Sequence, residues 1–138
     1  MKEYESFATE GALPHRSYYI PFAEEDKVKY RYGIVDRQSS SEFFSLDGTW
    51  EIKQHACPEE VDIDEVLVDV VPVPASLQMH GYDQLQYLNC RYPFPCDPPY
   101  VPHENPTWHY RKRFTLAKED RAYYLYFEGV DSFFYVYV

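Results

Sequence analysis

The stretch SLDGTWEIK, residues 45–53, decides the fold class. Its Asp-Gly pair is typical of a tight turn, and after the turn Trp50 and Ile52 alternate with Glu51 and Lys53. This alternation places the apolar side chains on one face and the charged side chains on the other, as on a half-buried β-strand. The sequence therefore predicts that a folded unit begins near residue 45 with a strand.

Further strand patterns follow this one. Residues 66–73 are rich in β-branched side chains and end at prolines. Because proline cannot donate a ladder hydrogen bond, this segment is either an edge strand or a strand that ends there. Residues 108–114 and 123–128 alternate in character, and residues 133–138 are apolar on both faces, which is typical of a strand inside a sandwich. No long 3.6-residue period is present, so the predicted fold class is all-β.

The two ends of the chain differ in character. We expect residues 1–44 to form an irregular arm, in which residues 16–22 are apolar enough to pack and residues 38–41 are typical of a loop. A last strand that is apolar on both faces needs neighbours on each side, yet the sequence stops at Val138. We therefore expect residues 45–138 to be a partial β-sandwich, incomplete at its C-terminal end, at the front of a longer protein.

Composition excludes several classes of function. The 138 residues include 13 Lys and Arg against 23 Asp and Glu, a net charge of -10, and an acidic surface repels nucleic acid. No apolar run approaches the roughly 18 residues that cross a bilayer, and the N-terminus lacks the apolar region of a secretory signal.

Cys57, Cys90 and Cys96 show no CxxC spacing, so we expect free thiols in a reducing cytoplasm; a disulfide between two of them is the alternative.

Neither the acidic nor the histidine residues show a catalytic or metal-binding spacing. The acidic run from Glu59 to Glu65 reads as a solvated loop, with nothing to desolvate a carboxylate for acid/base chemistry. The histidines form no HxH or HExxH pattern, so we expect none of them to bind a metal. They are His15, His55, His80, His103 and His109.

Residues 73–110 are the segment most suited to meeting a ligand. Six prolines between residues 93 and 106 stiffen it, and a stiff loop on a sheet holds polar side chains in place. Asn89 and Asp97 offer hydrogen-bonding groups. Aromatic side chains could stack on sugar rings or cover the loop's own contact with the sandwich: Tyr82, Tyr87, Tyr92, Phe94 and Tyr100. A third interpretation, a proline motif for SH3-type domains, is disfavoured by the acidic surroundings.

Within and around this segment the chain resembles the N-terminal sugar-binding domain of glycoside hydrolase family 2, and among its members the large cytoplasmic β-galactosidases. The matching motifs occur in the family's order. They are SLDGTW (45–50), VP (73–74), QMHGYD (78–83), Asn89, RYPFP (91–95), DPPYVP (97–102), ENPT (104–107), YR (110–111) and FEGVDS (127–132). The chain departs from the family at residues 75–77, at Leu88 and Cys90 on either side of Asn89, and at Trp108. At the Trp108 position relatives usually have glycine.

The resemblance implies a jelly-roll β-sandwich in an enzyme that hydrolyses β-galactosides such as lactose with retention. Such enzymes use two glutamates about 5 Å apart. The resemblance places both glutamates, with magnesium and sodium sites, in a downstream barrel, so this chain would contain no catalytic residue, no metal and no cofactor. Its contribution would be Asn89, whose amide offers both a donor and an acceptor to sugar hydroxyls. The parent would be a cytoplasmic homo-oligomer without a nucleic-acid or membrane partner.

A different class of function stays open at this point. A free-standing carbohydrate-binding β-sandwich module would show the same strand patterns and the same aromatic loop. The two hypotheses differ in the last strand, because an independent module should close its own sheet.

Overall fold

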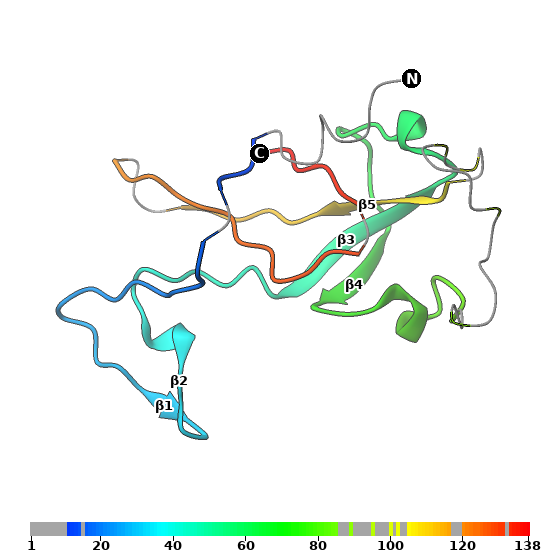
Figure 1. The fold of residues 1–138 in the computed structure, drawn as a ribbon. Helices are drawn as coiled ribbons and strands as arrows, with labels where there is room; N and C mark the ends of the chain where they lie inside the picture. The colour runs from blue at the N-terminus through cyan, green and yellow to red at the C-terminus, as the bar shows by residue number, and fades with distance from the viewer. Residues whose placement is uncertain are drawn as a thin grey trace.

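The computed structural model describes residues 11–14, 16–85, 89, 95, 100, 102, 105–116, 120–131 and 133–138. Within these ranges the chain forms two small antiparallel sheets and three short 3₁₀-helices, and it contains no α-helix (Figure 1). None of the helices described is long and apolar enough to traverse a bilayer. The predicted all-β class is confirmed, and the described part is a fragment of a β-sandwich.

The larger sheet has three strands in the order β4-β3-β5. Its central strand β3 spans Gly48–His55, and both β4 (Asp69–Val73) and β5 (Thr107–Arg111) pair with it in antiparallel fashion. The strand predicted from the alternation at residues 50–53 is thus the centre of the sheet. Among the described residues the β4 strand lies at an edge of the sheet, in agreement with its prolines.

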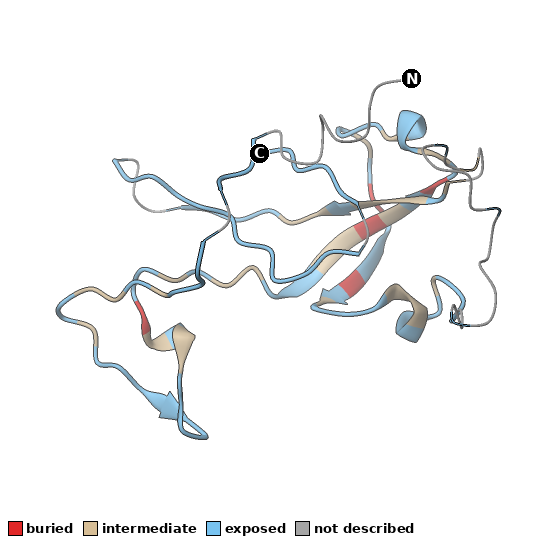
Figure 2. Cartoon of the chain, viewed as in Figure 1, coloured by how far each residue is buried: buried red, intermediate tan, exposed pale blue. Residues whose placement is uncertain are grey.

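The two faces of this sheet differ in chemistry. On one face Ile52 (0% exposed) and Val71 (2% exposed) are buried, and Trp50, the register partner of Val71, lies half-buried beside them. The other face presents charged and polar side chains, because residues 51, 53 and 55 of β3 alternate with the apolar ones. Figure 2 shows that buried residues concentrate on β3 and β4 and that most of the remaining described chain is exposed.

The N-terminal arm contains a small hairpin and a helical turn. Strands β1 (Tyr30–Arg31) and β2 (Ile34–Val35) pair across a turn in which Tyr32 and Gly33 both adopt positive φ, the geometry that two-residue hairpin turns require. The 3₁₀-helix η2 (Arg37–Ser39) follows directly. The prediction of an irregular arm missed this hairpin, because two-residue strands are too short to show an alternating pattern.

The predicted strands at residues 123–128 and 133–138 are wrong for the chain as the structure describes it. Residues 121–131 and 133–138 belong to no sheet, and β5 ends at Arg111, earlier than the predicted residue 114. A strand exists only where a neighbour accepts its backbone hydrogen bonds, and alternation of side chains cannot supply that neighbour.

This C-terminal segment contacts the arm through side chains. The rings of Tyr18 and Tyr126 lie 4.7 Å apart, the guanidinium of Arg16 lies 5.6 Å from the Tyr124 ring, and Arg37 pairs with Glu128. The prediction that residues 16–22 pack against another part of the chain is confirmed by these contacts. The last described residues fold back on the segment, with the Phe127 and Phe134 rings 5.0 Å apart.

Candidate functional site

The segment predicted to meet a ligand begins with an ordered turn next to β4. The 3₁₀-helix η4 (Leu77–His80) ends at Gly81, whose N–H donates to the Gln78 carbonyl. The φ of 78° at Gly81 turns the chain so that the next N–H, of Tyr82, donates to the Leu77 carbonyl at 3.2 Å. A left-handed residue at this position satisfies the last carbonyls of the turn, and glycine adopts it without a Cβ clash. The QMHGYD motif is therefore a capped turn in which Gln78 Nε2 also donates to Asp83 Oδ2 at 3.1 Å.

An aromatic contact holds this turn against the sheet. The Tyr82 ring packs edge-on against Trp108 of β5 with centroids 5.4 Å apart, a favourable arrangement for aromatic pairs. Tyr82 is half-buried, so it serves the loop's contact with the sheet. Trp108 supplies the other half of this contact. The sequence had left open whether such aromatics stack on sugar or on the protein, and for Tyr82 the structure shows the second.

Asn89, the predicted substrate-binding residue, lies in a turn and is exposed. Tyr100 is also exposed, at 58%. Most of the other predicted ligand-facing residues fall outside the described residues: Tyr87, Tyr92, Phe94 and Asp97, as do Cys90, Cys96, His15 and His103. The sugar-binding role of Asn89 therefore stays a prediction.

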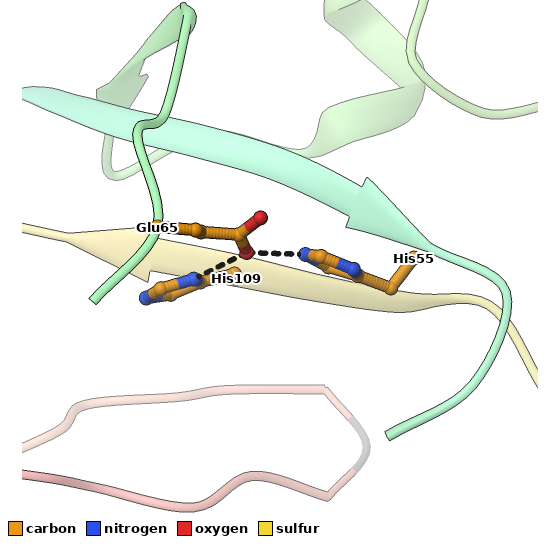
Figure 3. A group of neighbouring side chains, drawn as sticks. All are labelled: His55, Glu65 and His109. Carbon is orange, nitrogen blue, oxygen red and sulfur yellow. Dashed lines mark hydrogen bonds and ion pairs between the residues drawn. The ribbon is translucent and has the colours of Figure 1, made fainter. Parts of the chain in front are cut away.

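A second polar site lies on the charged face of the sheet, and the sequence did not predict it. Figure 3 shows His55 from the end of β3, His109 from β5 and Glu65 from the connection between β3 and β4. Glu65 Oε1 lies 2.6 Å from His55 Nε2 and 3.1 Å from His109 Nδ1, and the three side chains are only 7–12% exposed. The expectation that Glu65 lies in a solvated loop is wrong.

The charges around Glu65 account for its protonation state. Lys53 donates to Glu65 Oε2, and this hydrogen bond is the main reason that the pKa of Glu65 is lowered to about 2. The hydrogen bond with His109 and the charges of His55 and Lys53 also lower this pKa, whereas burial raises it. Arg111 Nη1 donates to the Glu65 carbonyl at 2.8 Å, which fixes the backbone above the sheet. Glu65 is therefore ionised at neutral pH and cannot serve as a general acid there.

Another cluster of charged side chains on the same face is centred on Glu51. Arg111 Nε donates to its carboxylate at 2.9 Å and Arg113 Nη1 at 3.2 Å, and the Arg111 hydrogen bond is the main reason that the pKa of Glu51 lies below its usual range. Lys112 Nζ donates to the Thr49 carbonyl at 3.0 Å. These residues line a hollow of about 210 Å³.

Signals for these clusters are absent from the linear sequence. Glu65 and His109 are 44 positions apart, and only the pairing of β3 with β5 brings their segments together. Alternation predicted that Glu51 and Lys53 share the charged face, but it did not extend to His55. Which carboxylate covers that face depends on the path of the connection after β3, which no motif specifies.

Comparison with known proteins assigns the family. The profile described as the sugar binding domain of glycosyl hydrolases family 2 matches residues 43–138. Similar curated relatives include a β-galactosidase of Staphylococcus xylosus, 37% identical over 130 residues, and one of Actinobacillus pleuropneumoniae, 36% identical over 131; each alignment covers 91% of this chain. A β-galactosidase of Vibrio vulnificus is 42% identical over 101 residues, or 67% of the chain.

These alignments cover only a small part of each relative. The chain spans 13%, 12% and 10% of the lengths of the three β-galactosidases, respectively. The shared part includes the three-stranded sheet and the capped turn described above, because the matched profile begins before β3 and continues past β5. The chain therefore belongs to glycosyl hydrolase family 2, through the sugar binding domain of that family.

Proposed function

We propose that this chain is the N-terminal part of a β-galactosidase and that it shapes the substrate site without breaking the glycosidic bond. The match of the family 2 sugar binding domain to residues 43–138, together with relatives that are β-galactosidases, is the observation that supports this most strongly. The bond-breaking glutamates would then belong to a downstream domain, and a β-galactoside such as lactose would be the substrate.

The charged groups in the described part support a non-catalytic role. A retaining glycosidase needs one carboxylic acid that is protonated near neutral pH and a second, ionised carboxylate about 5 Å away. Glu65 and Glu51, the two carboxylates held on the sheet, both have lowered pKa values because of their cationic hydrogen-bond donors. Neither can supply the proton that the leaving group requires.

We assign substrate contact to Asn89. It is exposed, and it follows a turn that is anchored to β5 through Tyr82 and Trp108. An amide offers a donor and an acceptor to neighbouring hydroxyls, and one such hydrogen bond contributes about 0.5–1.5 kcal/mol. The anchored turn would fix where the following loop leaves the sheet and so limit the positions that Asn89 can take.

The test is Asn89→Ala in a full-length enzyme that has this chain as its N-terminal part. We expect kcat/KM for a chromogenic β-galactoside to fall about two- to twelvefold, the factor that corresponds to one hydrogen bond, with an unchanged melting temperature. Gln84→Ala, an exposed amide earlier in the same segment, is the matched control and should leave both quantities unchanged. A lower melting temperature with unchanged kinetics would make Asn89 structural and contradict the assignment.

A further inference from the structure

We propose that His55, Glu65 and His109 form a binding site for a divalent transition-metal ion of the zinc class. One donor atom from each residue lies within 4.8 Å of the others, on the charged face of the central sheet (Figure 3). This site is separate from the proposed sugar contact at Asn89, and it departs from the expectation from the sequence that the chain holds no metal.

The strongest sign of a missing partner is at His55. Its side chain is 7% exposed, and its Nε2 atom is fully buried without a hydrogen-bond partner among the described residues. The nitrogen lies 2.6 Å from Glu65 Oε1 as one half of an ion pair, and it forms no hydrogen bond with any described residue. A buried polar atom left unsatisfied costs free energy, and a metal ion between nitrogen and carboxylate would remove that cost.

The donor set selects the kind of ion. Two imidazole nitrogens and one carboxylate oxygen are the ligands of open zinc sites, whereas magnesium and calcium prefer oxygen ligands alone. Ligand atoms in a tetrahedral zinc site lie about 3.3 Å from one another. The His109 Nδ1–Glu65 Oε1 distance of 3.1 Å already fits this spacing, and the His55 Nε2–Glu65 Oε1 distance needs to widen by only about 0.7 Å.

The sheet holds the ligands in place before any ion binds. In the register of β3 with β5, Lys53 lies opposite His109 and His55 lies opposite Thr107, so the two histidines are diagonal neighbours on one face. Glu65 is fixed from above by the Arg111 hydrogen bond to its carbonyl. Such support for the ligands is what metal sites use to orient their first coordination sphere.

The positive charge of Lys53 should weaken the binding of a metal ion at this site. Its ammonium occupies Glu65 Oε2, which leaves Oε1 free to face the histidines, but its positive charge opposes a second cation nearby. Removing that charge while keeping all three ligands should therefore strengthen metal binding. A cluster with a purely structural role would show no such response.

The experiment is calorimetric titration of the 138-residue chain with Zn²⁺ alone, supported by the visible absorption of bound Co²⁺. We expect one ion per chain, and at least a tenfold weaker affinity in His55→Ala and in His109→Ala. His80→Ala is the matched control, because His80 is exposed on η4 and lies outside the cluster, and it should bind as the unmodified chain does. Lys53→Met should bind Zn²⁺ severalfold more tightly.

A readout on the unmodified chain covers the case in which a histidine variant fails to fold. Nitrogen-15 NMR of the imidazoles should show that Zn²⁺ shifts the signals of His55 and His109 and leaves that of His80 in place. Equal shifts at all histidines, unchanged affinity in His55→Ala, or weaker binding in Lys53→Met would each overturn the proposal.

Discussion

Ile52 and Glu51 are neighbours in β3, yet they serve opposite faces of the sheet. Ile52 is completely buried between β4 and β5, where its register partners are Asp69 and Tyr110, while Glu51 holds Arg111 and Arg113 on the charged face. The two-residue period that the sequence shows at this point thus separates packing from charge pairing along a single strand.

Replacing Ile52 with alanine should cost about 2–5 kcal/mol of unfolding free energy, because it leaves a cavity in the middle of the sheet. Urea denaturation followed by circular dichroism measures this loss. Val70→Ala is the control, since Val70 is 57% exposed on the opposite face of β4 and should change stability by less than about 0.5 kcal/mol. Equal effects of the two substitutions would show that Ile52 is not the packing centre of the sheet.

Glu51→Gln should make stability less dependent on pH. The folded pKa of Glu51 lies below the ordinary 4.5, so its ionised form stabilises the fold above that pH, and this stabilisation is lost as the pH falls through the folded pKa. The variant should therefore be less stable than the unmodified chain near neutral pH, and the difference should shrink in acid. Urea midpoints at about pH 7 and about pH 3 measure it, with exposed Glu24→Gln as the control. A difference that stays constant over this range would rule out the ion pair as its source.

At the scale of elements, alternation predicted β3 and most of β5, because each forms a local pattern on a paired strand. The edge position of β4 was predicted from its prolines. The same rule failed for residues 123–128 and 133–138, whose side chains alternate or are apolar but whose backbone has no sheet neighbour in the described chain. For the β1–β2 hairpin the rule made the opposite error and missed strands that exist, because four paired residues are too few to show a period.

The arm and the C-terminal segment should protect each other through their aromatic contact. Tyr18→Ala removes the ring that lies 4.7 Å from Tyr126, so we expect faster amide hydrogen exchange in residues 121–128. Tyr30→Ala, in which a 69% exposed ring on β1 is lost, is the control and should leave exchange in that segment unchanged. Unaltered exchange in Tyr18→Ala would mean that the arm does not hold this segment.

At the scale of the whole molecule, the motifs around residues 45–50, 78–83 and 97–107 predicted the family, and the profile match over residues 43–138 confirmed it. The His55–Glu65–His109 cluster could not be predicted, because three short segments meet only after β3 and β5 have paired. Trp108 could be interpreted from the sequence only in part. The resemblance marked it as a departure from the family's usual residue, but only the folded structure shows its contact with Tyr82.

We have proposed that this chain shapes a galactoside site and breaks no bond. The most direct test of this proposal is the hydrolysis of a chromogenic β-galactoside by the purified 138-residue chain, compared with the same chain joined to the remaining domains of the enzyme. We predict no turnover by the chain alone and full turnover by the joined protein. Hydrolysis by the isolated chain, proportional to its concentration and retained through repeated purification, would contradict the account.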